Sequence, residues 1–519
     1  MIRHTLLEDP YRLAPGIAPV VRELPADLET PVSVYLKLAG QGPSFLLESV
    51  TGGEQLARYS FIGVNPSRAY LLRAGQAQSL ALGQDGRMTL SEVLDSRPNP
   101  LDALREALGS HRYQSRPGLP RFAGGLVGFL SYEMMRYFEP SLRLEPHPEI
   151  PEAIFLLADT LVAFDHAFGR LVLIGNANPA DANGRSPSQV EAQLDEIERR
   201  LMSPLPEAIH KPLKPVDSVT RSNFSQEAFC RAVERAKEHI AAGDIFQVVL
   251  SQRLEGETCI APFDIYRALR RLNPSPYMFY FDFAELTGSE PLRLIGASPE
   301  MHCRLEGRTA AVRPIAGTRK RGRNPEEERI LEEELLADPK ERAEHVMLVD
   351  LGRNDLGRIC RYGSVQVSEQ MVIERYSHVI HLVSHVEGEL RPEYDAFDLL
   401  QATFPAGTVS GAPKIRAMQI IDDLEGEARG PYAGVVGYFS YDGSMDTCIA
   451  IRTMVMRGQT ISIQAGAGIV ADSQPEREYQ ETLSKARALG VAVEMAEQKV
   501  CSAETEKEKG VQSQEERKR

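Results

Sequence analysis

Short apolar runs bounded by turn-forming residues recur along this chain, and such runs favour β-strands. They occupy residues 44–49, 59–63, 154–158, 161–164, 245–250, 277–281 and 292–295. Helical periodicity is present over residues 189–201 and 225–242, and the second of these segments is followed by Gly243. Strands and helices do not alternate strictly, so we predict an α+β fold and not a doubly wound parallel sheet.

A proline-rich stretch divides the 519 residues into two large segments. Four prolines fall within a dozen residues at Pro204, Pro206, Pro212 and Pro215. Such a composition is typical of a linker. We therefore predict an N-terminal domain over 1–202, a linker over 203–222 and a second domain over 223–498. Residues 499–519 carry many charges of both signs and almost no apolar side chains, which predicts a disordered tail.

The charge balance excludes several classes of function. The chain has 59 basic and 73 acidic residues, a net charge of −14, which does not suit binding to a phosphate backbone. No apolar run approaches the roughly 18 residues of a membrane helix, and the N-terminus lacks a signal-peptide pattern. The six cysteines are scattered, which is typical of reduced thiols in the cytoplasm.

Two acidic pairs stand on separate predicted helices. Asp338-Pro339 is a helix-start pattern, and Glu341 and Glu344 follow on one face of that helix. A second helix is predicted from Pro475 to Gly490, with Glu478, Glu481 and Lys485 at positions i, i+3 and i+7. Two such faces can hold one Mg²⁺, which prefers a few carboxylates and several waters. A solvated acidic face on each helix is the alternative reading.

Glycine-rich and histidine-rich segments give weaker signals. Residues 465–468 and 407–414 contain neither a complete dinucleotide fingerprint nor a P-loop, so they are ordinary turns or backbone anion sites. His378, His381 and His385 lie in a β-like segment, which does not favour a three-histidine metal site. The similar segments 125–132 and 434–441 read as two core strands whose glycines permit close packing.

Several longer motifs stand in a characteristic order. They occupy residues 314–319, 340–345, 350–355, 404–414 and 465–469, followed by the helix with Glu478 and Glu481. Together they resemble the chorismate-utilising enzymes over residues 223–490. Residues 46–49 and 58–63 resemble the N-terminal region of the anthranilate synthase component I family, which extends the likeness to nearly the whole chain.

The resemblance implies a fold, a reaction and a metal ion. The fold is an α+β sandwich of two large antiparallel sheets flanked by helices. The reaction is a lyase reaction that converts chorismate and ammonia to anthranilate and pyruvate in tryptophan biosynthesis. Mg²⁺ would be held by Glu344 and Glu481, with Glu341 and Glu478 beside them, and would act as a Lewis acid on the substrate.

The resemblance also assigns residues to the reaction. Glu300 matches the general acid for the departing 4-hydroxyl, a role that needs a raised pKa. His381 matches a histidine that assists loss of the enolpyruvyl group, and Gln247 and Thr318 complete the catalytic set. The substrate-binding positions implied are Thr408, Tyr432, Arg452, Gly466, Ala467, Gly468 and Lys485.

Two positions separate members of the family. Ala316 stands where aminodeoxychorismate synthases usually carry a lysine, and Gln247 stands where isochorismate and salicylate synthases carry a water-activating lysine. The absence of both amines favours attack by external ammonia. The alternatives are an aminodeoxychorismate synthase subunit and a non-catalytic amino-acid sensor on the same fold.

A partner and an effector follow from the same likeness. None of the six cysteines lies in the Gly-x-Cys-x-Gly context of a glutaminase nucleophile, so a separate glutamine amidotransferase subunit is expected, in a heterotetramer of two large and two small subunits. Feedback tryptophan is expected to bind where two segments supply a carboxylate, a hydroxyl and apolar walls. The residues implied are Glu48, Ser49, Pro274, Pro276, Tyr277 and Met278.

Overall fold

The computed structural model describes most of the chain. The described residues are 16–40, 42–49, 58–83, 87–94, 98–109, 113–179, 184–206, 221–376 and 379–516, with the backbone alone for 499–516. His378 and most of the expected linker, residues 207–220, lie outside these ranges. None of the helices in these ranges combines the length and apolar character needed to cross a membrane.

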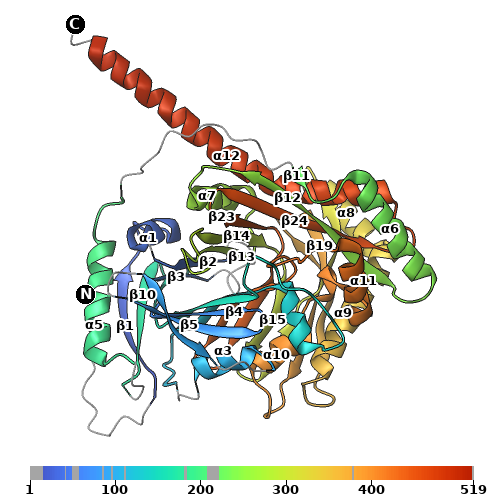
Figure 1. Cartoon of the computed structure of the whole chain (residues 1–519), viewed down its shortest axis with the longest axis horizontal. Helices are drawn as coiled ribbons and strands as arrows, with labels where there is room; N and C mark the ends of the chain where they lie inside the picture. Colours follow the sequence, from blue (N-terminus) through green and yellow to red (C-terminus); the bar gives the residue numbers. More distant parts are fainter. Residues whose placement is uncertain are drawn as a thin grey trace.

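Two large antiparallel sheets form the centre of the molecule (Figure 1). The first contains, in spatial order, β1 (Ala18–Pro25), β10 (Arg170–Ala177), β9 (Thr160–Asp165), β3 (Tyr59–Val64), β2 (Ser44–Glu48), β13 (Tyr277–Asp282), β14 (Leu292–Ser298), β23 (Thr453–Arg457), β24 (Thr460–Ile469), β12 (Gln247–Glu257) and β11 (Arg221–Ser222), with β20 (Gly411–Ala412) beside β12. The second contains β17 (Ile315–Lys320), β19 (Val379–Glu389), β16 (Thr309–Val312), β15 (Met301–Glu306), β22 (Met445–Ile449), β21 (Val435–Ser440), β7 (Gly125–Leu130), β8 (Ala153–Ala158), β4 (Arg68–Arg73), β5 (Gln76–Leu82) and β6 (Met88–Leu94), with β18 (Gln366–Arg375) beside β19.

Helices cover the outer faces of both sheets. On the first sheet they are α1 (Pro31–Leu38), α5 (Pro187–Leu201), α7 (Pro262–Leu272) and α12 (Pro475–Glu516), with α6 (Gln226–Ala241) and α11 (Lys414–Glu425) over β12 and β24. On the second they are α3 (Leu101–Leu108), α4 (Met135–Phe138), α9 (Pro339–Gly357), α10 (Ala396–Thr403) and, over β17 and β19, α8 (Pro325–Ala337). Between the sheets lies an aromatic core that includes Phe45, Phe61, Phe129 and Phe281. The expected sandwich is therefore confirmed.

The N-terminal and C-terminal segments share both sheets. In the first sheet β2 pairs with β13, with Glu48 opposite Met278. In the second, β7 pairs with β21, so the two similar segments seen in the sequence are neighbours, with Gly128 opposite Gly437. The expected boundary at residues 203–222 therefore does not separate two independent bodies. Its last two residues form β11, which pairs with β12. Pairing across hundreds of residues leaves no local signal in a sequence.

Gly128 and Gly437 show why this pairing needs glycine. A Cβ atom at Gly128 would lie 1.9 Å from the carbonyl oxygen of Ile154, and one at Gly437 would lie 2.2 Å from that of Asp446. Real Cβ atoms do not approach backbone oxygens so closely. The neighbouring strands can therefore pack only against bare backbone at these two positions, as the sequence predicts.

Helix α12 differs from the expectation at its C-terminal end. The sequence predicted an end at Gly490 and a disordered tail, but the helix continues to Glu516 and leaves the body of the molecule (Figure 1). Gly490 lowers helix propensity by about 1 kcal/mol. Buried Leu489, Ala492 and Val493 offset that cost by packing against the first sheet. Beyond residue 499 the sequence is rich in Glu and Lys, with Gln and Arg as well, and all four are good helix formers.

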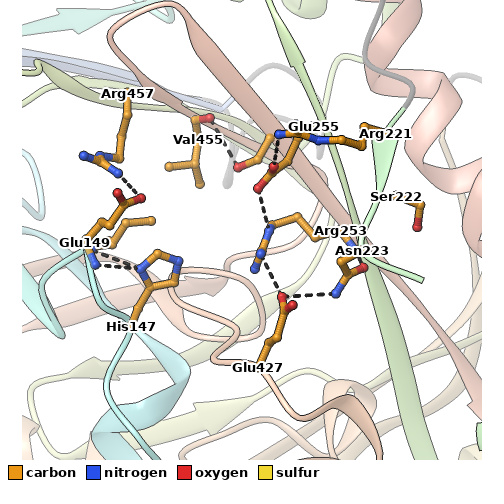
Figure 2. Close-up of polar contacts among 12 residues, drawn as sticks. His147, Glu149, Arg221, Ser222, Asn223, Arg253, Glu255, Glu427, Val455 and Arg457 are labelled. Atoms are coloured by element: carbon orange, nitrogen blue, oxygen red, sulfur yellow. Dashed lines mark hydrogen bonds and ion pairs between the residues drawn. The ribbon is translucent and has the colours of Figure 1, made fainter. Parts of the chain in front are cut away.

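A polar network joins the N-terminal segment to the strands of the first sheet (Figure 2). Arg457 of β23 forms an ion pair with Glu149, which lies in the connection before β8. The neighbouring His147 accepts hydrogen bonds from the amides of Glu149 and Ile150. Burial and the nearby Arg253 and Arg457 lower the pKa of His147 to about 4. This histidine is therefore neutral at pH 7.

Candidate active site

The two acidic helices come together at one end of β12. Asp338 caps α9 by accepting hydrogen bonds from the amides of Lys340 and Glu341, as its helix-start pattern predicts. Glu344, one turn farther along, accepts a hydrogen bond of 3.3 Å from the Gln247 side chain. Burial, together with the negative charges of Glu341 and Glu481, raises the pKa of Glu344. Carboxylates from α9 and α12 therefore lie within electrostatic reach of one another.

Basic residues pair with two of these carboxylates. Arg319 binds Glu341 at 3.0 Å, and Lys485 binds Glu481 at 2.8 Å. Burial raises the pKa of Glu478, and the charge of Glu481 adds to that rise. Within the described ranges no three acidic, histidine or cysteine side chains are gathered at ligand distances from a common point. The donor set of like-charged carboxylates nevertheless fits Mg²⁺, because a hard cation relieves the repulsion that, together with burial, raises the pKa values of Glu344 and Glu478.

The glycines of β24 make room for two side chains of the site. A Cβ at Gly468 would lie 2.6 Å from the Gln247 amide nitrogen, and a Cβ at Gly466 would lie 2.6 Å from the Tyr432 hydroxyl. Lys485 donates a hydrogen bond of 2.9 Å to the Gly466 carbonyl. Residues 466–468 therefore form a smooth strand surface beneath Gln247 and Tyr432, and Ala467 itself is buried against α6 and α11.

Glu300 is a buried carboxyl in the short connection between β14 and β15. Its side chain is almost fully inaccessible, and burial raises its pKa to about 8. The Thr408 hydroxyl, the Ile315 amide and the Arg452 guanidinium oppose this rise but do not cancel it. Glu300 is therefore protonated at neutral pH, which is the state that a general acid needs.

Arg452 is a half-buried cation that no carboxylate pairs with among the described residues. No hydrogen bond or ion pair reaches its side chain from the part of the chain that the structure describes. Burial lowers its pKa, while Glu300 and Tyr376 act in the opposite direction. Its backbone has a φ of 48°, a left-handed conformation that is costly for a residue with a side chain and is typical of functional sites. The Thr408 hydroxyl beside Glu300 is buried as well.

His381 lies on β19, opposite Thr318 of β17. Its Nδ1 atom is 2.9 Å from the Gly317 carbonyl oxygen and 3.1 Å from the Thr318 hydroxyl. Because a carbonyl can only accept, Nδ1 carries the proton and Nε2 of the neutral ring is left as an acceptor. Burial lowers the pKa of His381 and Arg452 adds to the effect, so the ring is neutral.

Tyr376 is a residue of this cluster that the sequence did not reveal. Its ring lies 5.4 Å from that of His381, and it interacts electrostatically with Glu300 and Arg452. The sequence around it carries no spacing or motif that distinguishes a site tyrosine from a core tyrosine.

A separate cavity of about 1640 Å³ lies between the two sheets. Glu48, Ser49, Pro276, Tyr277 and Met278 all line it, and Pro274 does not. One oxygen of Glu48 binds Arg270 at 2.9 Å and accepts a hydrogen bond from Tyr266, while its other oxygen and the Ser49 hydroxyl are buried without partners. The structure thus gathers five of the six expected effector residues, and it adds Arg270 and Tyr266, which no motif indicated.

Comparison with known proteins places this arrangement in a family. The sequence profile of chorismate binding enzymes matches residues 45–490. The chain belongs to the chorismate binding enzyme family. Anthranilate synthase component 1 from Acinetobacter calcoaceticus is 46% identical over 92% of this chain and 95% of its own, and the protein of that name from Thermus thermophilus is 47% identical over 93% and 99%.

Solved structures of the family share the fold. The crystal structure of anthranilate synthase component I from Streptococcus pneumoniae TIGR4 superimposes with a TM-score of 0.74 and 39% identity, over 90% of this chain and 99% of that one. The menaquinone-specific isochorismate synthase MenF of Escherichia coli, at 22% identity, gives a TM-score of 0.66 over 92% of this chain and 95% of its own. This second match shows a shared fold and nothing further.

Proposed function

We propose that the chain is the large subunit of an anthranilate synthase, a lyase that converts chorismate and ammonia to anthranilate and pyruvate. The observation that carries this proposal is a protonated, buried Glu300 beside the unpaired guanidinium of Arg452. A chorismate carboxylate is a bidentate partner for such a guanidinium. The two proteins named anthranilate synthase component 1, at 46% and 47% identity, support the same reaction.

Each group in the cluster then has a task. Arg452 binds the enolpyruvyl carboxylate, and the Thr408 hydroxyl and the backbone at Gly466 and Gly468 hold other oxygens of the substrate. Ammonia adds at C2 while Glu300 gives its proton to the 4-hydroxyl, which departs as water. The C2 proton is then lost and the enolpyruvyl group leaves, assisted by His381, so that the ring becomes aromatic. The departing enolate takes up one proton at its methylene carbon to become pyruvate. Glu300 must be reprotonated before the next turnover.

The acidic helices are the proposed Mg²⁺ site. Glu344 and Glu481 would hold the ion, with Glu341 and Glu478 beside them, directly or through water. Bound there, Mg²⁺ supplies Lewis-acid polarisation of the substrate's ring carboxylate. Gln247 orients Glu344 through its hydrogen bond, and Thr318 orients His381.

The cysteines support a separate source of ammonia. Burial raises the pKa of Cys303 to about 12 and that of Cys360 to about 11, so neither is a thiolate at neutral pH. We infer that a glutamine amidotransferase subunit releases ammonia from glutamine and that two copies of each subunit assemble. Alone, this chain should use ammonium salts and not glutamine.

The cavity between the sheets is the proposed site for feedback tryptophan. The free Glu48 oxygen and the Ser49 hydroxyl can bind an ammonium group, and Tyr277 and Met278 provide apolar walls. By linkage, chorismate should weaken tryptophan binding by the factor by which tryptophan weakens chorismate binding.

Product identification tests the central proposal. The purified chain is incubated with chorismate, ammonium and Mg²⁺, and the products are separated and identified. Anthranilate and pyruvate in equal amounts are expected. Aminodeoxychorismate without pyruvate would instead identify the related synthase, and no turnover of chorismate would favour a non-catalytic sensor.

A further inference from the structure

A buried arginine stands behind the proposed substrate site. Arg429 follows α11, and its side chain is almost completely inaccessible. It holds the Glu425 carboxylate in a bidentate pair, with distances of 2.8 Å from Nε and 2.6 Å from Nη2. The pair is neutral as a unit, so its burial does not leave an uncompensated charge.

The remaining donors of Arg429 reach two backbone segments of the site. Nη1 donates to the Val409 carbonyl at 2.8 Å, directly after Thr408. Nη2 donates to the Val249 carbonyl at 2.7 Å, two residues after Gln247 on β12. A single planar guanidinium therefore fixes the distance between the Thr408 turn and the strand that carries Gln247.

The same group also contacts Tyr432 and, through Glu425, the glycine strand. The Arg429 guanidinium carbon lies 5.6 Å from the centre of the Tyr432 ring. Glu425 accepts hydrogen bonds from the amide and hydroxyl of Ser251 at 2.7 and 2.9 Å. Ser251 lies opposite Gly466 in the pairing of β12 with β24. Four separate pieces of the substrate-binding surface thus meet at one ion pair.

We propose that Arg429 is a positioning residue that holds Thr408, Gln247, Tyr432 and Gly466 in the arrangement that binds substrate. Arg429 does not itself touch any of the groups that would react. The proposal rests on the proposed function, because it takes chorismate as the substrate. A lysine cannot replace the arginine, since one ammonium group cannot span a carboxylate and two divergent carbonyls at once.

The test compares Arg429→Lys with wild type by steady-state kinetics and thermal unfolding. We expect the KM for chorismate to rise about tenfold or more with a smaller change in kcat, because loosened binding groups weaken substrate affinity. Asp165→Asn is the control, since it removes the charge of another buried carboxylate, on β9, which pairs with the partly exposed Arg58 and Arg170. The control should lower the unfolding temperature and leave KM unchanged.

Two further measurements keep the outcome decisive. If Arg429→Lys does not fold, Glu425→Gln keeps the shape of the pair, weakens it, and should raise KM by a smaller factor. Wild-type turnover of chorismate is measured in the same assay, so failure of the proposed reaction is distinguishable from failure of this inference. Folded variants with wild-type KM, whatever their unfolding temperature, would show that the pair has only a structural role.

Discussion

Replacing Glu300 with glutamine tests the reaction and the electrostatics of the site together. Glutamine keeps the size and polarity of the protonated acid but cannot give up a proton. If Glu300 is the general acid, kcat should fall by about 10² to 10⁴. Wild-type kcat, measured at constant free ammonia, should decline above about pH 8 as the carboxyl ionises.

The same variant should lose activity but gain stability at alkaline pH. Burial raises the Glu300 pKa from 4.5 to about 8 in the folded protein. Folding therefore favours the protonated form of Glu300. The resulting contribution to the unfolding free energy is complete below pH 4.5 and is lost as the pH rises through 8. By linkage, the wild type should lose about 4 kcal/mol of unfolding free energy between pH 5 and pH 9 from this group alone.

Denaturant unfolding of wild type and Glu300→Gln at pH 5 and pH 9 measures this difference. The variant should be more stable than the wild type at pH 9 and similar to it at pH 5, while being nearly inactive at both. Glu152→Gln is the control, because Glu152 is also buried with a raised pKa but lies outside the site. Near-wild-type turnover by Glu300→Gln, with the same alkaline decline, would refute the assignment.

Other changes probe the remaining parts of the molecule. Glu481→Gln should abolish Mg²⁺ binding, measured by calorimetry, and lower turnover at least about 100-fold; unchanged binding would remove Glu481 from the metal site. Ser49→Phe should keep turnover but abolish inhibition by added tryptophan, and persistent inhibition would place the effector elsewhere. Acidification from pH 7 to pH 5 should lower the unfolding free energy by about 1–2 kcal/mol through His147, because this histidine has a pKa of about 4 when folded and 6.5 when unfolded, so that it is protonated first in the unfolded chain. His147→Asn should remove this part of the pH dependence of stability. Gly128→Ala should destabilise by more than about 3 kcal/mol in denaturant unfolding, whereas Gly490→Ala in α12 should be neutral or stabilising by up to about 1 kcal/mol.

The sequence predicts the local elements of this fold better than their pairing. Apolar runs identify strands such as β2 and β13, and the cap at Asp338 identifies the start of α9. That β2 lies beside β13 depends on which apolar edges fit one another in space, and no local pattern encodes it. The end of α12 was misplaced for a related reason, because Gly490 is a stop signal only when nothing beyond it is buried.

The candidate site was predictable where a motif carried it. The acidic spacing of Glu341, Glu344, Glu478 and Glu481 raises a shared cation site as one reading, beside two solvated acidic faces, and the family likeness selects the cation site. Glu300 was identified only through the family likeness, since a lone glutamate after Ser298-Pro299 has no spacing to interpret. Its raised pKa arises from burial, which depends on the finished fold. Arg429 has no motif at all, and its contacts with Val249 and Val409 follow from distant segments meeting in space.

The sharing of both sheets by the two ends of the chain has a consequence for its synthesis. Strand β7, whose edge pairs with β21, emerges from the ribosome about 300 residues before β21 does. At 5–20 residues per second, that edge waits roughly 15–60 s with its backbone donors and acceptors unpaired. Sheet edges exposed for so long are templates for aggregation, and slow pairing between distant strands extends the exposure. A nascent chain of this architecture should therefore depend on chaperones until residues 435–440 have been made, and shortened chains that end before them should be insoluble.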